Sequence, residues 1–438
     1  MPSPRCLDVT SNVVPPAYWT RPSVIMGAAL ALRLLWAACV PVDPVSDGVL
    51  YEAFARSMVE GHGYAFADGT LTEYWPVGTS AVYALLYYIF GIHPWVVPVF
   101  QAFLGTLIVG LTWRIARQAL GPAVASLAAW LTAIWPLLIE FTTIPASELL
   151  FTALILASLN IWTSRRLPFV ARTMFWGACI AAATYVRPTA WPLLVIFPAM
   201  QWIFDRDWRA FITGALLAIL TASLLFAPWS YRSVVLFDRF ALVSANGGVN
   251  LWMGNNPEST GGYMDLPNKQ FLNEVDRDHY YGREAVNFIL SHPLIYAKLS
   301  VKRAMTTYGR ETIGVVWNEK GLTAKYGSAS LVAFKRISTM YWWSMLLLGA
   351  VGIILILRRR LAAQQWPLLA SFGYLSVFPV LTVAMDRYHV PIDPMLAIFA
   401  AYGLLVMRER VSSRTVSLPE VQHSKSYEYP EPGEQQRA

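Results

Sequence analysis

The chain has 438 residues, of which 56% are hydrophobic and 14% are charged, a balance too apolar for a soluble globular protein. Its net charge of +7 does not call for a nucleic acid partner, because Lys and Arg gather in the loops between apolar segments, as orientation in a membrane requires. The scattered cysteines, Cys6, Cys39 and Cys179, form no CxxC motif and predict neither a disulfide framework nor a thiolate metal site.

Apolar segments long enough to suggest membrane helices recur along the chain. They cover 22–41, 76–91, 94–117, 121–139, 146–163, 172–186, 189–204, 210–228, 341–357, 365–384 and 390–407. Segment 76–91 is short and begins at Pro76. If it dips into the bilayer without crossing, the basic clusters near Arg114, Arg165 and Arg358 all fall on the cytoplasmic side. We therefore predict ten crossings, with both termini inside; a crossing 76–91 would make eleven.

These segments predict an all-α polytopic membrane protein with about 10–11 transmembrane helices, interfacial helices in the first outer loop and a small mixed extracytoplasmic domain. Residues 1–21 form a cytoplasmic lead, and 22–228 form an N-terminal membrane module whose first outer loop is 42–75. Residues 229–340 form the extracytoplasmic domain, 341–407 the C-terminal membrane helices, and 408–438 a disordered cytoplasmic tail, since the tail has few apolar residues.

The first outer loop carries most of the acidic candidates. Asp47 follows the first apolar segment and shares a helix face with Tyr51, four residues later. The segment after it is amphipathic and is typical of a helix lying along an interface. An acid held at the lipid–water boundary is a functional candidate, whereas the alternative for Asp47 is a carboxylate that caps a helix. Glu73 lies where the loop returns to the membrane surface.

Later turns place further ionisable residues on the same side. Glu148 follows Pro145 and opens a helix, where its charge also suits the helix dipole. Arg187 lies at the outer surface, either as a ligand or as an interfacial anchor. The last outer turn carries Arg387 and Tyr388, and Arg is well suited to bind phosphate.

Region 229–340 adds polar candidates. Its Gly- and Asn-rich stretch 243–257 favours turns and leaves side-chain amides to bond hydroxyls, so it is either a carbohydrate-binding or a purely structural loop. The candidates in it are Asn246, Asn250, Trp252 and Asn255. A basic amphipathic helix starts at His292-Pro293, carries Lys298, Lys302 and Arg303, and is typical of a headgroup-facing element.

No Walker loop, GxGxxG or HExxH motif is present, so ATP-driven transport and zinc proteolysis have no support. Instead, six stretches occur in an order that resembles the membrane glycosyltransferases of the GT-C superfold. The nearest branch is the bacterial one grouped with protein O-mannosyltransferases and the aminoarabinose transferase of lipid A (family 39-like). The resemblance covers 22–407 and rests on SDGVLYEAFARSMVEGHGY, EYWPVGTSAVYALLYYIFG, PASELLFTALILASLNIW, TYVRPTAW, NGGVNLWMGNNPESTGGY and DRYHVPIDPMLAIFAAYG.

The resemblance implies a sugar donor on a polyprenyl phosphate, used at the outer face of the cytoplasmic membrane, and a catalytic acid in the first outer loop, which Asp47 matches. Related enzymes often have a second carboxylate beside that acid, but here Gly48 follows. A two-carboxylate site would need Asp43, Glu73 or Glu148.

We therefore expect an inverting glycosyl transfer to a glycan, lipid or protein acceptor, with Asp47 as general base. Arg187 and Arg387 are expected to stabilise the leaving phosphate, with Lys298, Lys302 or Arg303 in reserve. A divalent metal ion held by Asp47, Glu73 and Glu148 could do part of the same work. The alternatives are a polytopic transporter or lipid flippase, and a non-catalytic relative that binds glycolipid.

Overall fold

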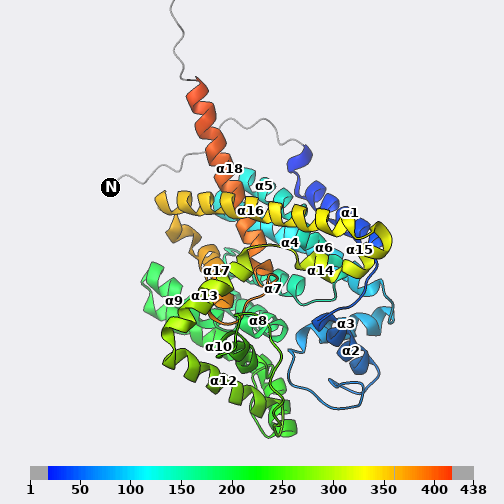
Figure 1. Ribbon diagram of the computed structural model, residues 1–438. Helices are drawn as coiled ribbons and strands as arrows, with labels where there is room; N and C mark the ends of the chain where they lie inside the picture. The colour runs from blue at the N-terminus through cyan, green and yellow to red at the C-terminus, as the bar shows by residue number, and fades with distance from the viewer. Residues whose placement is uncertain (1–17, 360, 417–438) are drawn as a thin grey trace, which may run out of the picture.

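A computed structural model describes residues 18–359 and 361–416 of the chain (Figure 1). These residues are mostly helical and contain no β-strand apart from an isolated bridge between Ala65 and Leu71. The predicted all-α class is therefore confirmed. Residues 1–17, in the predicted lead, and 417–438, in the predicted tail, lie outside the described residues.

Eighteen α-helices are interspersed with four short 3-10 helices along the described chain. Their bounds are η1 Tyr18–Thr20, α1 Pro22–Cys39, α2 Asp47–Val59, α3 Gly78–Phe90, α4 Val96–Leu120, α5 Pro122–Ala133, α6 Pro136–Glu140, η2 Phe141–Thr143, α7 Glu148–Trp162, α8 Phe169–Val186, η3 Pro188–Ala190, α9 Leu193–Asp205, α10 Trp208–Phe237, α11 Gly247–Gly254, α12 Glu274–Ser291, α13 Pro293–Tyr308, α14 Ile313–Trp317, α15 Glu319–Tyr326, α16 Ala329–Arg358, α17 Ala362–Leu381, η4 Val390–Ile392 and α18 Asp393–Val416.

All eleven predicted apolar segments form helices, and the chain is a multi-pass membrane protein. Within the described residues, 6 helices are long and apolar enough to cross a membrane, namely α1, α4, α8, α10, α16 and the stretch 390–410, which joins η4 to most of α18. The α5–α6 pair, bent by 56°, would make a seventh, and its break falls at Pro136, which cannot continue the helix of α5. This count is lower than the ten predicted crossings, partly because 146–163 and 189–204 form helices of 15 and 13 residues.

Segment 76–91 forms α3, which has 13 residues. At 1.5 Å per residue such a helix is about 20 Å long, short of the ~30 Å hydrocarbon core. This length agrees with a segment that dips into the bilayer. α3 packs on α2 through Tyr51, Tyr83 and Tyr87, and Gly78 lets it approach α8, since a Cβ there would lie 2.6 Å from the backbone of Tyr185. The first loop is thereby attached to the helix bundle beside α8.

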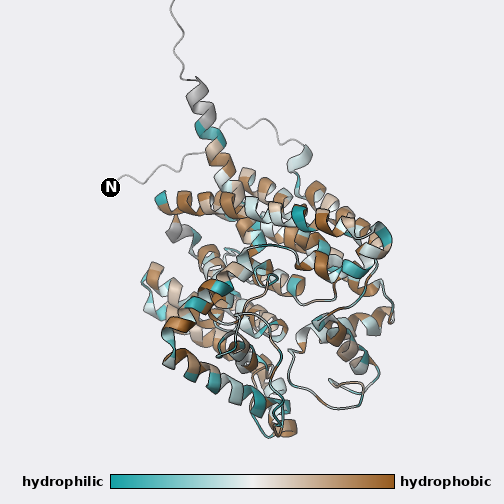
Figure 2. Cartoon of the chain, in the orientation of Figure 1, coloured by the Kyte–Doolittle hydropathy of each residue, from teal (hydrophilic) through white to brown (hydrophobic). Residues whose placement is uncertain are grey.

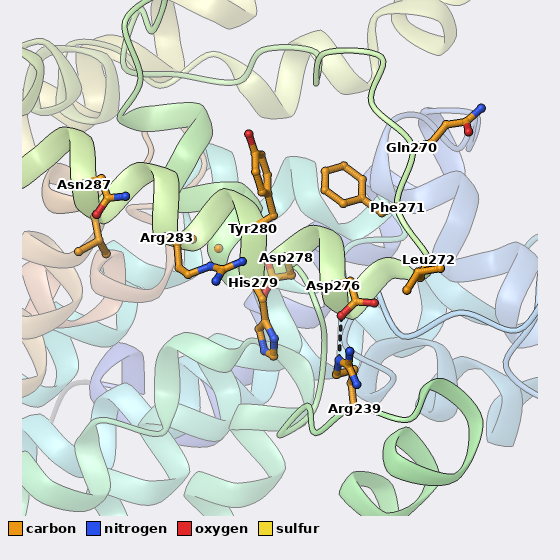
Figure 3. Close-up of a pocket in the computed structure, with 13 residues that line it drawn as sticks. Arg239, Gln270, Phe271, Leu272, Asp276, Asp278, His279, Tyr280, Arg283 and Asn287 are labelled. Carbon is orange, nitrogen blue, oxygen red and sulfur yellow. Dashed lines mark hydrogen bonds and ion pairs between the residues drawn. The ribbon is translucent and has the colours of Figure 1, made fainter.

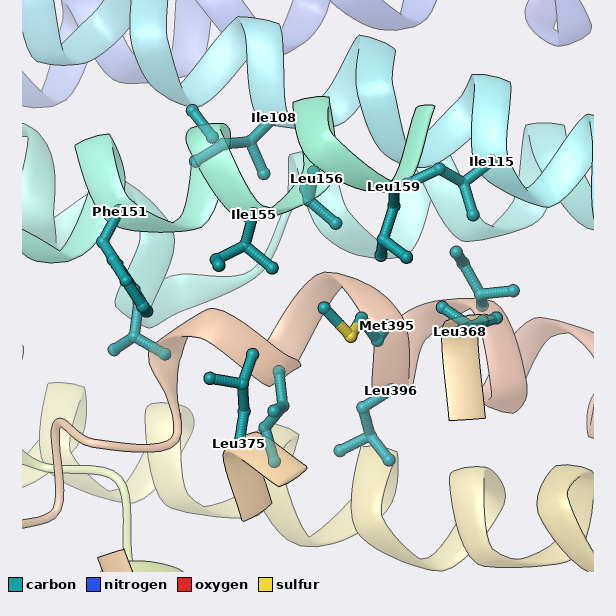
Figure 4. Packing of buried hydrophobic residues seen from close by; sticks show 14 of the residues in the cluster. Ile108, Ile115, Phe151, Ile155, Leu156, Leu159, Leu368, Leu375, Met395 and Leu396 are labelled. Carbon is teal, nitrogen blue, oxygen red and sulfur yellow. The ribbon is translucent and has the colours of Figure 1, made fainter. Parts of the chain in front are cut away.

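The core of the bundle is a series of packed helices. α18 packs on α16 and α5, α5 on α4, α4 on α1 and α7, and α7 on α8. Figure 4 shows the centre of this core, where hydrophobic side chains from α4, α7, α17 and α18 meet. Small residues allow the closest of these contacts: a Cβ at Gly352 of α16 would lie 1.9 Å from the carbonyl oxygen of Phe399 in α18.

Region 229–340 is helical and differs from the predicted mixed domain. It contains α11 to α15, while α10 continues into it as far as Phe237 and α16 begins within it at Ala329. Hydrophilic residues are frequent on α12, whereas hydrophobic residues dominate α1, α4 and α16 (Figure 2). At the other end of the chain α18 extends to Val416, so residues 408–416 of the predicted disordered tail are helical.

Candidate active site

Asp47 is the first residue of α2, and the backbone around it is unusual. Ser46, just before it, has a φ of 53°, a conformation that costs free energy for a residue with a side chain and is often found at functional sites. Gly48, just after it, lies against the turn before α7: a Cβ at this position would be 2.9 Å from the carbonyl oxygen of Pro145. The absence of a side chain at Gly48 therefore lets the start of α2 approach the start of α7.

Glu148 is the first residue of α7, and its side chain is fully buried. Arg187, which follows α8, forms an ion pair with Glu148 and donates from Nε to Ser147 Oγ at 2.9 Å. A buried carboxylate is tolerated when it is paired and hydrogen-bonded in this way. Glu148 thus holds Arg187 in place at the end of α8.

Arg387 connects this pair to Asp47. Its Nη2 donates to Asp47 Oδ2 at 2.6 Å and its Nη1 to Glu148 Oε1 at 3.2 Å. Its guanidinium carbon lies 4.6 Å from the ring centroid of Trp317, a cation–π distance. We call Asp47, Glu148, Arg187 and Arg387 the arginine cluster; it unites three regions of the chain that are far apart in sequence.

The two carboxylates of the arginine cluster differ in access. The Asp47 side chain is 29% exposed and that of Glu148 is 0% exposed. Burial by itself would raise the pKa of Asp47, but the charges of Arg387 and Arg187 outweigh burial and lower this pKa below its ordinary value. The pKa of Arg387 is raised, because Glu148 and Asp47 overcome the effect of its burial. Asp47 is therefore an ionised carboxylate that a ligand can reach.

Two aromatic candidates adjoin the arginine cluster. Tyr388 lies under both guanidinium groups, with its ring centroid 5.8 Å from Arg187 and 5.6 Å from Arg387. Tyr51 is buried, and its pKa is raised first by burial and then by the charge of Asp47. The phenol of Tyr51 therefore remains protonated beside the carboxylate.

Glu73 lies outside the arginine cluster. Its fully buried side chain pairs with Arg232 of α10, and its backbone N–H donates to Glu274 of α12 at 2.7 Å. Burial raises the pKa of Glu73 to about 7 despite the opposing charge of Arg232. Glu73 thus joins the first loop to α10 and α12. It has different partners from Asp47 and Glu148 and is not part of the arginine cluster.

The polar candidates of 243–257 serve mainly to pack this segment. Asn255 is buried, and its Nδ2 donates to the carbonyls of Leu251 and Thr382. Asn246 accepts from Ser244 Oγ at 3.1 Å, and the Trp252 ring lies 4.7 Å from that of Tyr281 in α12. Asn250 is half-buried in α11. Trp252 and Tyr281 belong to an apolar cluster that also includes Tyr388. This segment therefore borders the arginine cluster.

The three basic residues of α13 fall into two groups. Lys298 and Lys302 are exposed and lie on one face with Leu294, Val301 and Met305, as expected of a helix at an interface. Arg303 is fully buried and donates to the carbonyls of Val380 and Gly254, each at 2.6 Å. Arg303 is therefore occupied in holding α13 to its neighbours.

A surface pocket of about 1040 Å³ lies along α12, and Figure 3 shows its lining. Arg239 and Asp276 meet at one end of it, with Nε and Oδ1 2.8 Å apart, while Phe271 and Tyr280 lie nearby. None of the arginine-cluster residues lines this pocket. Its position makes it a separate feature of the polar region.

Metal-binding capacity lies elsewhere in the described part of the chain. There, one group of three or more potential ligands has its ligand atoms close together, formed by Glu311, His389 and Asp393. The carboxylates proposed from sequence do not form such a group, because Asp47 and Glu148 bind arginines and Glu73 is paired separately.

The sequence did not indicate two of the partners described above. Trp317 covers Arg387 from the short helix α14, and Arg232 pairs with Glu73 from within α10. Neither belongs to a recognisable motif. The one available signal was Arg232 itself, a cation directly after a long apolar segment.

No family model matches the sequence, and a search of curated proteins found no match. Among solved structures, the chain shares its fold with membrane glycosyltransferases of the GT-C type, as the resemblance predicted. The archaeal oligosaccharyltransferase AglB from Archaeoglobus fulgidus, in complex with an inhibitory peptide and a dolichol-phosphate, gives a TM-score of 0.54 at 13% identity over 92% of this chain and 52% of that one. An Archaeoglobus fulgidus oligosaccharyltransferase in complex with Zn and sulfate gives a TM-score of 0.53 at 12% identity over 90% of this chain and 50% of that one.

ArnT from Cupriavidus metallidurans, bound to undecaprenyl phosphate, gives a TM-score of 0.54 at 12% identity and covers 90% of this chain and 63% of that one. The chain thus spans about half the length of AglB. At these identities the likeness establishes the fold and leaves the reaction to be inferred from the site.

Proposed function

We propose that this protein is a membrane glycosyltransferase that moves a sugar from a polyprenyl-phosphate donor to an acceptor on the outer face of the cytoplasmic membrane. The observation that carries the proposal is the contact of Arg387 with both Asp47 and Glu148. It puts an accessible carboxylate beside two fixed cations, which is what transfer from a phosphate requires.

Asp47 acts as the general base in this proposal. It takes the proton from an acceptor hydroxyl or amine while the acceptor atom forms a bond to the anomeric carbon of the sugar. The bond between that carbon and the phosphate oxygen breaks on the opposite side, so the configuration inverts. Its electron pair stays on the polyprenyl phosphate, which gains one negative charge.

Arg187 and Arg387 stabilise that charge. Both act through their positive charge, since the Arg187 side chain is 16% exposed and that of Arg387 is 7% exposed. Such cations favour the transition state when they are in position before the reaction. Glu148 is too buried to meet an acceptor and acts as a positioning residue that holds both guanidinium groups.

In this proposal the acceptor is a glycan, a lipid or a protein. AglB was solved with a dolichol-phosphate and ArnT with undecaprenyl phosphate, which supports a polyprenyl-phosphate donor here. A divalent ion at Asp47, Glu73 and Glu148 is disfavoured, because arginines neutralise all three carboxylates and would repel a cation.

The test compares glycans on lipid carriers and in the cell envelope of cells that lack the gene and cells that regain it. Wild-type protein should restore the missing glycan, and Asp47→Asn should lower transfer by roughly 10²–10⁴-fold, the usual contribution of a general base. The matched control is Asp43→Asn in the same loop, which loses only the surface pair with Lys320. Full restoration by Asp47→Asn would instead favour a transporter, a flippase or a non-catalytic glycolipid-binding role.

A further inference from the structure

A second group of ionisable side chains is sealed inside the protein. Glu311 lies between α13 and α14, His389 in the turn before η4, and Asp393 at the start of α18. All three are 0% exposed. One potential ligand atom from each lies within 4.8 Å of the other two. We call these three residues the histidine cluster.

Neighbouring groups fix the orientation of the histidine cluster. Trp135 Nε1 donates to Glu311 Oε1 at 2.9 Å, and His389 Nδ1 lies 3.0 Å from Asp393 Oδ1. The ring of Trp342 stacks on that of His389 with centroids 4.0 Å apart. These contacts are those of a site whose side chains are held ready by their surroundings.

Each member of the cluster keeps an unused polar atom. Glu311 Oε2, His389 Nε2 and Asp393 Oδ2 are buried without a hydrogen-bond partner among the described residues. The same holds for Oε2 of Glu140, a buried neighbour whose charge acts on Glu311. Buried polar groups are rarely left unpaired, and each such group calls for an explanation.

Among the described residues, no Lys or Arg forms an ion pair with a member of the histidine cluster. Arg387 is two residues from His389 but binds Asp47 and Glu148. Arg310, next to Glu311, is 69% exposed and its nearest carboxylate is Asp386, 3.7 Å away. Several buried acids without a positive partner are costly, and a bound cation would remove that cost.

We propose that Glu311, His389 and Asp393 bind one divalent transition-metal ion, for which Zn²⁺ is the best match. Imidazole nitrogen and carboxylate oxygen are both Zn²⁺ ligands, whereas Ca²⁺ and Mg²⁺ prefer six or more oxygen ligands and no imidazole. Bonds of about 2.0–2.2 Å would bring the three ligand atoms to about 3–3.5 Å from one another, so the cluster contracts on binding.

This site is distinct from the arginine cluster and does not rest on the proposed transfer reaction. Its ion would join the α13–α14 connection to the start of α18 and so stabilise the folded protein. Metal that binds only the native state raises its stability by mass action.

The experiment uses the full-length protein, purified in detergent, stripped with a chelator and titrated with Zn²⁺ alone. Bound metal is measured by elemental mass spectrometry and stability by thermal unfolding. Wild type should bind one Zn²⁺ per chain and unfold at a higher temperature with it. His389→Gln and Asp393→Asn should each weaken binding at least tenfold and lose the thermal shift. Asp47→Asn and Glu73→Gln should keep wild-type Zn²⁺ affinity and the same Zn²⁺-induced thermal shift, whatever their unfolding temperature without metal.

Wild-type protein that binds no stoichiometric Zn²⁺ would overturn the proposal. So would binding that survives in both cluster variants, or that disappears in Asp47→Asn. If His389→Gln fails to fold, Glu311→Gln takes its place, and the wild-type titration decides in either case.

Discussion

Two groups of carboxylates each include a residue of the turn at 386–389, and they are neutralised differently. In the arginine cluster Glu148 pairs with Arg187 and Arg387, and Asp47 is partly exposed. In the histidine cluster Glu311 and Asp393 are sealed from solvent and make no ion pair with Lys or Arg in the described chain. This turn contributes Arg387 to the arginine cluster and His389 to the histidine cluster.

The difference indicates what each group can do. Fixed cations beside an accessible carboxylate form a site prepared for an incoming anion such as a phosphate. Buried acids with no Lys or Arg partner form a site that can bind a metal ion from solution. Both clusters contain a fully buried carboxylate, so the position of the guanidinium groups and the access to Asp47 separate a reaction site from an ion site.

Among the variants that test this comparison, replacing Arg387 should cause the largest loss of transfer activity and stability. Arg387→Gln leaves Asp47 without its partner and Glu148 with Arg187 alone, so we expect transfer to fall by roughly 10²–10³-fold and unfolding free energy to fall by about 3–5 kcal/mol. Glycan transfer and thermal unfolding would be measured together. Arg310→Gln is the control from the same region, because its exposed pair with Asp386 is worth at most about 1 kcal/mol; equal losses in both variants would contradict the role of Arg387.

Gly48→Ala should have the next largest effect, since it separates the two acids of the arginine cluster. The added methyl would lie 2.9 Å from Pro145 O, and such overpacking costs about 1–3 kcal/mol. We expect a lower unfolding temperature together with lower transfer. Gly373→Ala provides the comparison, because a Cβ at Gly373 meets nothing within 4 Å; an unchanged Gly48→Ala protein would show that the close approach is unnecessary.

The acid limb of the pH–activity profile offers a smaller effect. Because Arg387 and Arg187 lower the pKa of Asp47, the base stays ionised as pH falls below the usual carboxylate range. Arg387→Lys, which keeps the charge but loses the paired hydrogen bonds, should move the acid limb of kcat/KM to higher pH. An unmoved limb in this active variant would exclude Asp47 as the titrating base.

Glu73→Gln should have the smallest effect and should alter stability alone. Burial raises the pKa of Glu73 from 4.5 to about 7, so its contribution to stability is present below about pH 4.5 and is lost as pH rises to about 7. Wild type should therefore lose more thermal stability than Glu73→Gln between these pH values. Glu60→Gln, at an exposed site in the same loop, should retain the wild-type slope, and a parallel slope in Glu73→Gln would contradict this assignment.

The helices were largely predictable from sequence, because apolar runs must become helices in a bilayer. The lengths of the helices were less predictable. Proline divides 121–139 into α5 and α6, and glycines lie at both ends of the short helix α3. The arginine cluster was partly predictable as well. Its four residues are all at the ends of apolar segments: Asp47, Glu148, Arg187 and Arg387. The predicted membrane topology places all of these ends on the same side of the membrane.

Other partners could not be foreseen, because they depend on packing between distant segments. The amide of Asn255 suits a sugar hydroxyl as well as it suits the Thr382 carbonyl that it binds. Glu73 pairs with Arg232 only because α10 continues beyond its apolar stretch. In the histidine cluster, the four-residue spacing of His389 and Asp393 was visible, but Glu311 reaches them only in the folded chain.

The contact between Gly48 and Pro145 also constrains how this loop can change over time. A second acid cannot be introduced at position 48 while the carbonyl of Pro145 lies 2.9 Å from its Cβ position. Descendants of this sequence that acquire a side chain there should carry a compensating change around position 145. Substitutions at these two sites should therefore occur together, and an aligned set of relatives would reveal them as a coupled pair.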